Sequence, residues 1–371
     1  MKKVILAILA VILCANLILC ACNDKQSKND NDADNEQIAP KTNEIAKFHA
    51  ELEAKLEQSQ EKFDNDKEIL LTVNGMPVSA TAVRYATLVF NATYEGQENS
   101  EELIQQEIEN FFRLNAAVVS VSKENNLTIS DEDWQTQIVD IINNYKTNFG
   151  EQYNSIFEEQ LLQTPFYHFL YRVYSLLYSN IYELYANDAD FDAKAKTKAL
   201  EMMNENDYVR AKHVLIKFPQ GEGEDGAVTE AQKDATFTTA KEITDRARAG
   251  EDFDALIKEY GEDPGMQANP GGYYFTKGDM LEAFETTTYA LAEGEISEPV
   301  ETIHGYHVIL KLPLEDDAIK SSEIYMSAVD QMLNEELMGT AKDYQIIYTD
   351  KYQERVAEYV AEYNASLQEA E

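Results

Sequence analysis

Hydrophobic and polar residues alternate with different periods in three parts of this 371-residue chain. From Thr81 to about Asn206, apolar residues recur every three or four positions, which predicts amphipathic helices. From Tyr208 to about Pro313, short apolar runs between glycine- and proline-rich turns predict strands with a few helices. Helical spacing returns after Asp317. The pattern predicts a compact α+β unit that interrupts a helical chain, and we expect the two flanks to pack together as one lobe.

Local signals predict where several elements begin and turn. The segment "EILLTVNGMPVSA" at 68–80 reads as a strand, an Asn-Gly turn and a short return strand. Ser130 is followed by three acidic residues, and Thr164 is followed by Pro165, which are both typical helix starts. A charged stretch at 45–65 is also expected to be helical.

The helix predicted after Pro165 carries a row of tyrosines at spacings of three and four, so all of them share one helix face. Two interpretations stay open for this row. It can pack in the core of the helical lobe, or it can form an aromatic surface that holds unfolded client proteins. The tyrosines are Tyr167, Tyr171, Tyr174, Tyr178, Tyr182 and Tyr185.

The N-terminus has the layout of a secretory signal peptide. Two lysines precede an apolar run from Val4 to Leu19, which is short for a transmembrane helix of about 20 residues. The run ends in "LCAC", which resembles a bacterial lipobox with Cys22 as the lipidated residue; ordinary secretion with cleavage nearby is the alternative. Residues 23–44 are polar and predict a disordered tether.

Charge and cysteine content limit the function further. Acidic residues outnumber basic ones by 68 to 31, a formal net charge of −37, which argues against nucleic acid as a partner. The same charge argues against electrostatic binding to anionic lipid, so a lipid on Cys22 is the expected anchor. No cysteine follows Cys22, so the folded part has no disulfides.

Two strands of the α+β unit carry a histidine at equivalent places. In "RAKHVLIKF", His213 shares a strand face with Leu215 and Lys217. In "GYHVILKL", His307 shares a face with Ile309 and Lys311. Two such strands in one small sheet would bring both histidines into one site. Helices are predicted between them at 236–250, 252–261 and within 279–294.

The order of these segments closely resembles the parvulin family of peptidyl-prolyl isomerases over all of 208–313. With the lipobox and the helical flanks, the whole chain resembles PrsA-type foldase lipoproteins of Gram-positive cell surfaces. Parvulins carry two histidines in the sheet, matched by His213 and His307. Their acidic or cysteine residue after the second helix is matched by Asp263, and their threonine before the second histidine by Thr302. The resemblance implies that these four residues are catalytic.

The resemblance also implies an apolar pocket for the proline ring. Met280 and Phe284 match its methionine and phenylalanine, with Phe275 beside them. The usual pocket leucine has no counterpart in "GGYYF", and Tyr273 is expected to substitute for it.

Two further departures from the family affect what the site binds. The position three before the second histidine is often serine and here is His304. The phosphate-selective branch has a basic loop after the first strand, whereas this chain has the acidic "PQGEGEDGAVTE" at 219–230, so a phosphorylated substrate is not expected. A metal bound by His304 and His307 is not expected either, because residues i and i+3 of a strand face opposite ways.

These features predict an α+β protein whose parvulin domain is inserted in a mostly helical chaperone lobe. We expect an isomerase that needs no cofactor, anchored outside the cytoplasm and folding secreted proteins with X–Pro bonds; a homodimer is possible. A holdase with a weak parvulin domain is the alternative, whereas a solute-binding lipoprotein would need two similar α/β lobes. The predicted parts are a signal peptide (1–21), a tether and helix (22–66), the first part of the helical lobe (67–207), the parvulin domain (208–313) and the segment completing the lobe (314–371).

Overall fold

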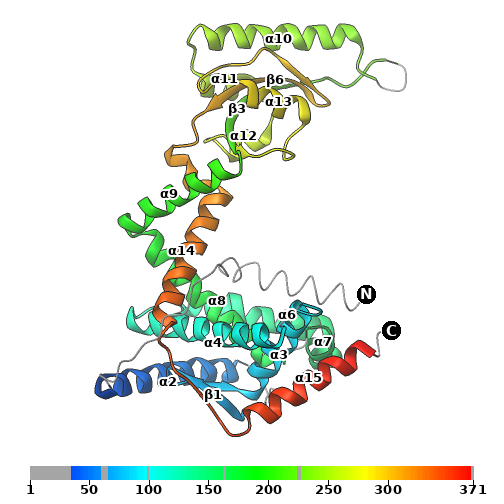
Figure 1. Cartoon of the computed structure of the whole chain (residues 1–371). Helices are drawn as coiled ribbons and strands as arrows, with labels where there is room; N and C mark the ends of the chain where they lie inside the picture. The colour runs from blue at the N-terminus through cyan, green and yellow to red at the C-terminus, as the bar shows by residue number, and fades with distance from the viewer. Residues whose placement is uncertain (1–34, 60–65, 98–99, 162–163, 224–226, 369–371) are drawn as a thin grey trace. The chain divides into compact units, whose positions relative to one another are not determined.

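The computed structural model describes residues 35–59, 66–97, 100–161, 164–223 and 227–368 (Figure 1). The chain forms two compact units, one made of Met1–Asp188 with Asp330–Glu371 and the other of Ala189–Val329. The second unit contains the whole 208–313 segment together with helix α9 (Ala189–Glu205) and the start of α14 (Glu323–Ala341). The predicted signal peptide and Cys22 lie outside the described residues.

The first unit begins, among the described residues, with helix α2 (Asn35–Gln58). The predicted tether extended to residue 44, so its last ten residues are helical and that part of the prediction is wrong. This stretch contains alanine, glutamate, glutamine and lysine, which are good helix formers, and the polar composition alone hid that. Within the described residues, no helix is both long and apolar enough to cross a bilayer.

The core of this unit is a set of packed helices. α4 (Ser100–Glu124) packs against α3 (Ala80–Thr93) and α8 (Pro165–Ala186), and α2 packs against α4 and α8. Between α4 and α8 lie α5 (Asp131–Trp134), a π-helical turn (Gln135–Val139), α6 (Asp140–Phe149), a 3-10 turn (Gly150–Gln152) and α7 (Tyr153–Leu161). The predicted caps are confirmed, because the side chains of Ser130 and Thr164 accept hydrogen bonds from backbone N–H groups of the first helical turn.

The predicted hairpin at 68–80 is confirmed and forms part of a three-stranded antiparallel sheet. Strand β1 (Ile69–Val73) lies between β2 (Met76–Ser79) and β7 (Ile346–Tyr348). Asn74 and Gly75 both have positive φ, 49° and 83°, as a tight Asn-Gly turn requires. Since β7 comes from the C-terminal segment, the two flanks share one sheet.

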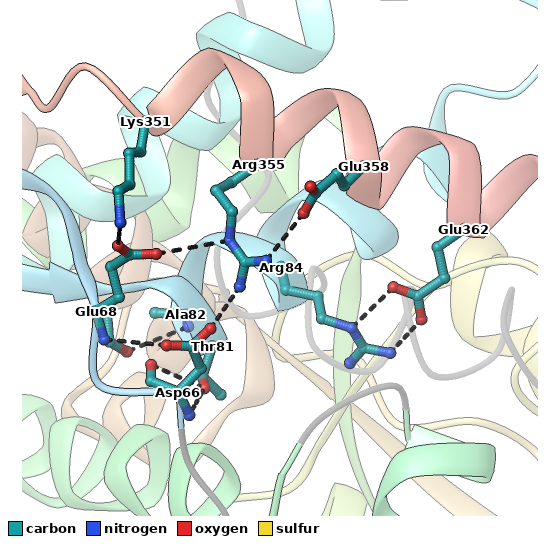
Figure 2. Close-up of polar contacts among 10 residues, drawn as sticks. Asp66, Glu68, Thr81, Ala82, Arg84, Lys351, Arg355, Glu358 and Glu362 are labelled. Carbon is teal, nitrogen blue, oxygen red and sulfur yellow. Dashed lines mark hydrogen bonds and ion pairs between the residues drawn. The ribbon is translucent and has the colours of Figure 1, made fainter.

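The C-terminal helix α15 (Tyr352–Gln368) packs along α3 and is held there by ion pairs (Figure 2). Arg355 pairs with Asp66 and, at 3.8 Å, with Glu68. Lys351 pairs with Glu68 as well. Arg84 of α3 pairs with Glu362, which lies about two turns along α15 from Arg355. In a chain of such negative charge, these few cations join segments almost 300 residues apart.

The tyrosine row on α8 is part of the core of the first unit. Tyr167 and Tyr174 are buried, and the remaining four are half-buried rather than exposed. The Tyr178 hydroxyl donates to Asp330 at 3.3 Å. The packing interpretation is therefore the one that the structure favours.

The second unit is built on a four-stranded antiparallel sheet in the order β4-β3-β6-β5. The strands are β3 (Val209–Lys217), β4 (Tyr273–Phe275), β5 (Val300–Thr302) and β6 (Gly305–Leu312). The helices are α10 (Glu230–Arg248), α11 (Phe253–Tyr260), α12 (Pro264–Ala268) and α13 (Glu282–Ala290), followed by a 3-10 turn (Asp317–Ser321). The fold is thus α+β, as predicted.

Helix α10 begins six residues before the predicted start at 236. Thr229 and Gln232 form a reciprocal capping box, which starts the helix at Glu230. Helix α13 ends at Ala290, before the predicted stop at Gly294. Both differences concern helix ends, whereas the positions of the two long strands agree with the prediction.

The sheet separates two apolar clusters, as the two-residue period of its strands requires. Val214 and Val308 point to the side covered by α10 and α11. Ala211 and Ile309 point to the other side, where they pack with Phe275 and Phe284. The histidines have the parity of this second side, so the helix α13 side of the sheet holds the candidate site.

Candidate active site

The register of β3 and β6 brings the two histidines together. Leu215 lies directly opposite His307, and His213 opposite Ile309, so the histidines are diagonal neighbours on one sheet face. Their Nδ1 atoms are 2.8 Å apart, and their rings stack at 13° with centroids 4.9 Å apart. A register slip of one residue would turn His307 to the α10 side and destroy the pair.

A second diagonal contact places Thr302. Val300 lies opposite His307 and Thr302 opposite Gly305, so Thr302 flanks His307 from the β5 side. Thr302 Oγ1 lies 2.9 Å from His307 Nε2. The hairpin is tight at Gly305, where φ is +147° and an added Cβ would come within 2.0 Å of the Ile216 carbonyl oxygen. Only glycine allows β6 to start this close to β3.

Asp263 reaches the histidines from the end of α11. The preceding residue, Glu262, donates its backbone N–H to the Leu215 carbonyl and so ties this segment to β3. The Asp263 side chain caps α12, with Oδ1 accepting the Gly265 N–H at 3.0 Å. Its Oδ2 lies 2.8 Å from His213 Nε2 and also accepts the Tyr273 hydroxyl at 2.8 Å.

These contacts form one continuous series of hydrogen bonds, in which donation runs from Thr302 through the two histidines to Asp263. The Asp263 carboxylate only accepts, so His213 donates from Nε2 and its Nδ1 is left as an acceptor. His307 therefore donates from Nδ1 to His213, and its Nε2 accepts the Thr302 hydroxyl proton. All four ring nitrogens are satisfied while both histidines stay neutral.

The electrostatics agree with this arrangement. Burial, together with the neighbouring His213 and His304, lowers the pKa of His307 to about 3. Burial also lowers the pKa of His213, although Asp263 acts in the opposite direction. For Asp263, burial would raise the pKa, but hydrogen bonds from Tyr273, His213 and the Gly265 amide outweigh it, and the pKa lies below the usual value. At neutral pH the site holds one carboxylate and two neutral imidazoles.

Apolar side chains cover the histidine pair. Phe284 of α13 lies edge-on to both imidazoles, with ring centroids at 5.2 and 5.4 Å, and 5.9 Å from the Phe275 ring. Met280 is half-buried against the same cluster. Tyr273 packs there too, with its ring 5.9 Å from that of His213. The structure thus brings all eight predicted site residues of the 208–313 unit together.

Two residues near the site have roles that the sequence did not suggest. His304 is exposed, and its backbone N–H donates to Thr302 Oγ1. Gly265 was missed: an added Cβ there would lie 1.9 Å from the Tyr273 hydroxyl oxygen. The only sequence signal for Gly265 is its place after Asp263-Pro264 at the start of a short helix.

Residues 213–312 match the family described as rotamase, PPIC-type PPIASE domain. This segment of the chain therefore belongs to the parvulin-type peptidyl-prolyl isomerases. Its first strand carries His213 and its last strand carries His307, and these strands pair with each other.

Relatives of the chain include foldase proteins named PrsA. It is 36% identical to the foldase protein PrsA of Geobacillus kaustophilus over 32% of this chain and 37% of that protein. It is 26% identical to the foldase protein PrsA of Caldanaerobacter subterraneus over 74% of this chain and 76% of that protein. The chain thus spans about a third of the first relative's length and three quarters of the second's.

Similar solved structures include PrsA from Bacillus subtilis, with a TM-score of 0.28 and 20% identity, covering 80% of this chain and 93% of that chain. The parvulin NmPin of Nitrosopumilus maritimus has a TM-score of 0.22 and 29% identity, covering 29% of this chain and 96% of that chain.

Proposed function

We propose that this chain is a peptidyl-prolyl cis-trans isomerase and foldase that acts on X–Pro bonds of secreted proteins. The observation that carries the proposal is the hydrogen-bonded chain from Thr302 to Asp263, which lies directly beneath Phe284 and Met280. An apolar surface next to a fixed polar network suits a proline ring and the amide bonded to it.

The chemistry requires no bond to be made or broken in the chain. An X–Pro amide isomerises in tens to hundreds of seconds at 25 °C, because twisting the C–N bond removes amide resonance. In the planar amide, resonance puts negative charge on the carbonyl oxygen, and the twisted amide loses that charge. A carboxylate held beside the carbonyl therefore disfavours the planar form more than the twisted one.

In this proposal the residues have separate tasks. Asp263 supplies the negative field, and His213, His307 and Thr302 keep it in place through a network that does not change protonation near neutral pH. Phe284, Met280 and Phe275 bind the proline ring and exclude water from the amide. Exclusion of water strengthens the effect of one carboxylate on the bound amide.

The test is the proline-limited refolding of a model protein in the presence of the full chain. We expect the chain to accelerate the slow phase, and Met280→Ala to reduce kcat/KM about tenfold because the pocket loses apolar contact. Met326→Ala is the matched control, since Met326 is 45% exposed on α14 and takes no part in the site.

Refolding without acceleration, but with less aggregation of the client, would replace the isomerase by a holdase. That second function is supported by relatives named foldase whose similarity extends beyond the parvulin segment, over 74% of this chain in one case. The helical unit would then be the part that binds unfolded client proteins.

The proposal includes a lipid anchor at Cys22 that keeps the chain at the outer face of a membrane, supported by the "LCAC" motif. Metabolic labelling with a radioactive fatty acid tests it. Wild-type chain should be labelled and Cys22→Ala should not, with unlabelled wild type counting against anchoring.

A further inference from the structure

Tyr273 has a second contact that separates it from the other pocket residues. Its ring packs with the apolar cluster, but its hydroxyl donates to Asp263 Oδ2 at 2.8 Å. The same oxygen accepts the Nε2 proton of His213 at 2.8 Å. Two donors from different strands, β4 and β3, therefore converge on one carboxylate oxygen.

The backbone next to Asp263 is shaped to admit this hydroxyl. A Cβ at Gly265 would lie 1.9 Å from the Tyr273 oxygen and 3.3 Å from Asp263 Oδ1. Any side chain at position 265 would thus push the tyrosine away from the carboxylate. Glycine at this position and tyrosine at 273 are coupled through space, although eight positions separate them.

We propose that Tyr273 is a positioning residue of the isomerase site, whose hydroxyl holds the Asp263 carboxylate facing His213. The inference rests on the function proposed above. It assigns Tyr273 a task beyond filling the place of a pocket leucine. The Asp263 carboxylate can only accept, so it fixes which nitrogen of each histidine donates. Loss of the Tyr273 hydroxyl would therefore leave this carboxylate less firmly held.

The groups that face Asp263 come from four elements. They are His213 of β3, the Tyr273 hydroxyl of β4, His307 of β6 behind His213, and the Gly265 N–H of α12. Burial would by itself raise the pKa of Asp263, and Tyr273 is the foremost of the hydrogen-bond donors that lower it. Phenylalanine has no hydroxyl to donate, so Tyr273→Phe should raise the pKa of Asp263 toward its usual value.

The experiment compares Tyr273→Phe with Tyr274→Phe in the full chain. Tyr274 is the next residue of β4, and its hydroxyl bonds the Leu314 carbonyl at 3.4 Å instead. Two readouts are used: the carboxyl 13C NMR titration of Asp263, assigned with Asp263→Asn, and the pH profile of kcat/KM for an X–Pro peptide. In Tyr273→Phe, we expect both the Asp263 titration and the acid limb of the pH profile to move to higher pH, because the carboxylate loses a hydrogen-bond donor. Tyr274→Phe should match the wild type.

A second variant tests the same contact from the other side. Gly265→Ala should move the Asp263 titration as Tyr273→Phe does, because it displaces the hydroxyl. In the Tyr273→Phe background it should add little further shift, since the contact is already lost. Independent, additive shifts would count against the coupling.

The outcomes separate this inference from the proposed function. An active chain whose Asp263 titration and pH profile are unchanged by Tyr273→Phe would overturn the inference alone. A wild-type chain without isomerase activity would overturn the proposed function and any positioning role in it, whatever the NMR titration shows.

Discussion

Each unit of the protein buries one histidine next to one carboxylate, and the two pairs differ in the hydrogen bonds that the carboxylate accepts. In the second unit His213 lies 2.8 Å from Asp263, which accepts further bonds from Tyr273 and a backbone amide. In the first unit His49 Nδ1 lies 3.7 Å from Glu53 and has no hydrogen-bond partner among the described residues.

The surroundings decide the charge state of each carboxylate. Donors around Asp263 outweigh burial and hold its pKa below the usual value. Among the described residues no donor bonds Glu53, and burial, with the nearby Glu57, raises its pKa to about 7 although Lys67 acts in the opposite direction. Burial likewise lowers the pKa of His49 to about 4. The comparison shows that a carboxylate next to a buried histidine keeps a low pKa when hydrogen-bond donors surround it, and that burial raises its pKa when they do not.

The largest effect on activity should come from His307→Ala, which removes the residue that links His213 to Thr302. His213 Nδ1 and the Thr302 hydroxyl both lose a partner, and we expect kcat/KM to fall about 100-fold, or about 3 kcal/mol. The measurement is the isomerisation rate of an X–Pro peptide. The urea midpoint from Trp134, the only tryptophan and a buried residue of the first unit, should stay where it is.

His49→Ala is expected to lower the stability of the first unit and to leave the isomerase activity unchanged. His49 Nε2 lies 2.6 Å from the hydroxyl of Tyr174, which is also buried, so the substitution leaves a cavity and an unpaired hydroxyl. The free energy of unfolding of the first unit should drop by about 2–4 kcal/mol, read from Trp134 fluorescence in urea. Isomerisation per folded molecule should not change. His304→Ala, at an exposed histidine, is the control for stability, and an equal loss there would contradict the contrast.

The pH dependence of the first unit should sharpen the comparison. Because the pKa of Glu53 is raised to about 7 by burial, its contribution is present below its usual pKa and is lost as pH rises through about 7. Relative to Glu53→Gln, the wild type should lose about 2–3 kcal/mol of unfolding free energy between pH 4.5 and 7.5. His49 titrates in both proteins, and since burial is the cause of its lowered pKa, most of its opposite effect is common to the two curves. Parallel curves from Trp134 fluorescence would show that Glu53 titrates normally.

The smallest effect should come from Arg355→Ala, which removes the centre of the ion pairs in Figure 2. The side chain is partly exposed, so we expect a loss of about 1 kcal/mol in the first unit, smaller still in high salt. Lys241→Ala, which removes an exposed pair with Asp245 in the second unit, is the matched control and should not move the Trp134 midpoint. A loss that salt does not reduce would point to packing against Tyr359 instead.

Short-range features were predictable because neighbouring residues determine them. The hairpin at 68–80, the caps at Ser130 and Thr164 and the two histidine strands follow from turn chemistry, capping and the two-residue period of a strand. The shared face of the tyrosines on α8 follows from helical spacing. The start of α10 is encoded just as locally, by the capping box of Thr229 and Gln232, although the predicted start lay six residues later.

The sequence by itself determined which residue types face the same side of each strand, and with the family resemblance it named the site residues. Only the tertiary structure decided which of them touch. The β3–β6 register makes His213 and His307 diagonal neighbours, and the return of β4 brings Tyr273 over Gly265 to Asp263. It also placed His49 against Tyr174, 125 positions away. Contacts of this kind depend on how separate elements pack, and no local period or spacing encodes that.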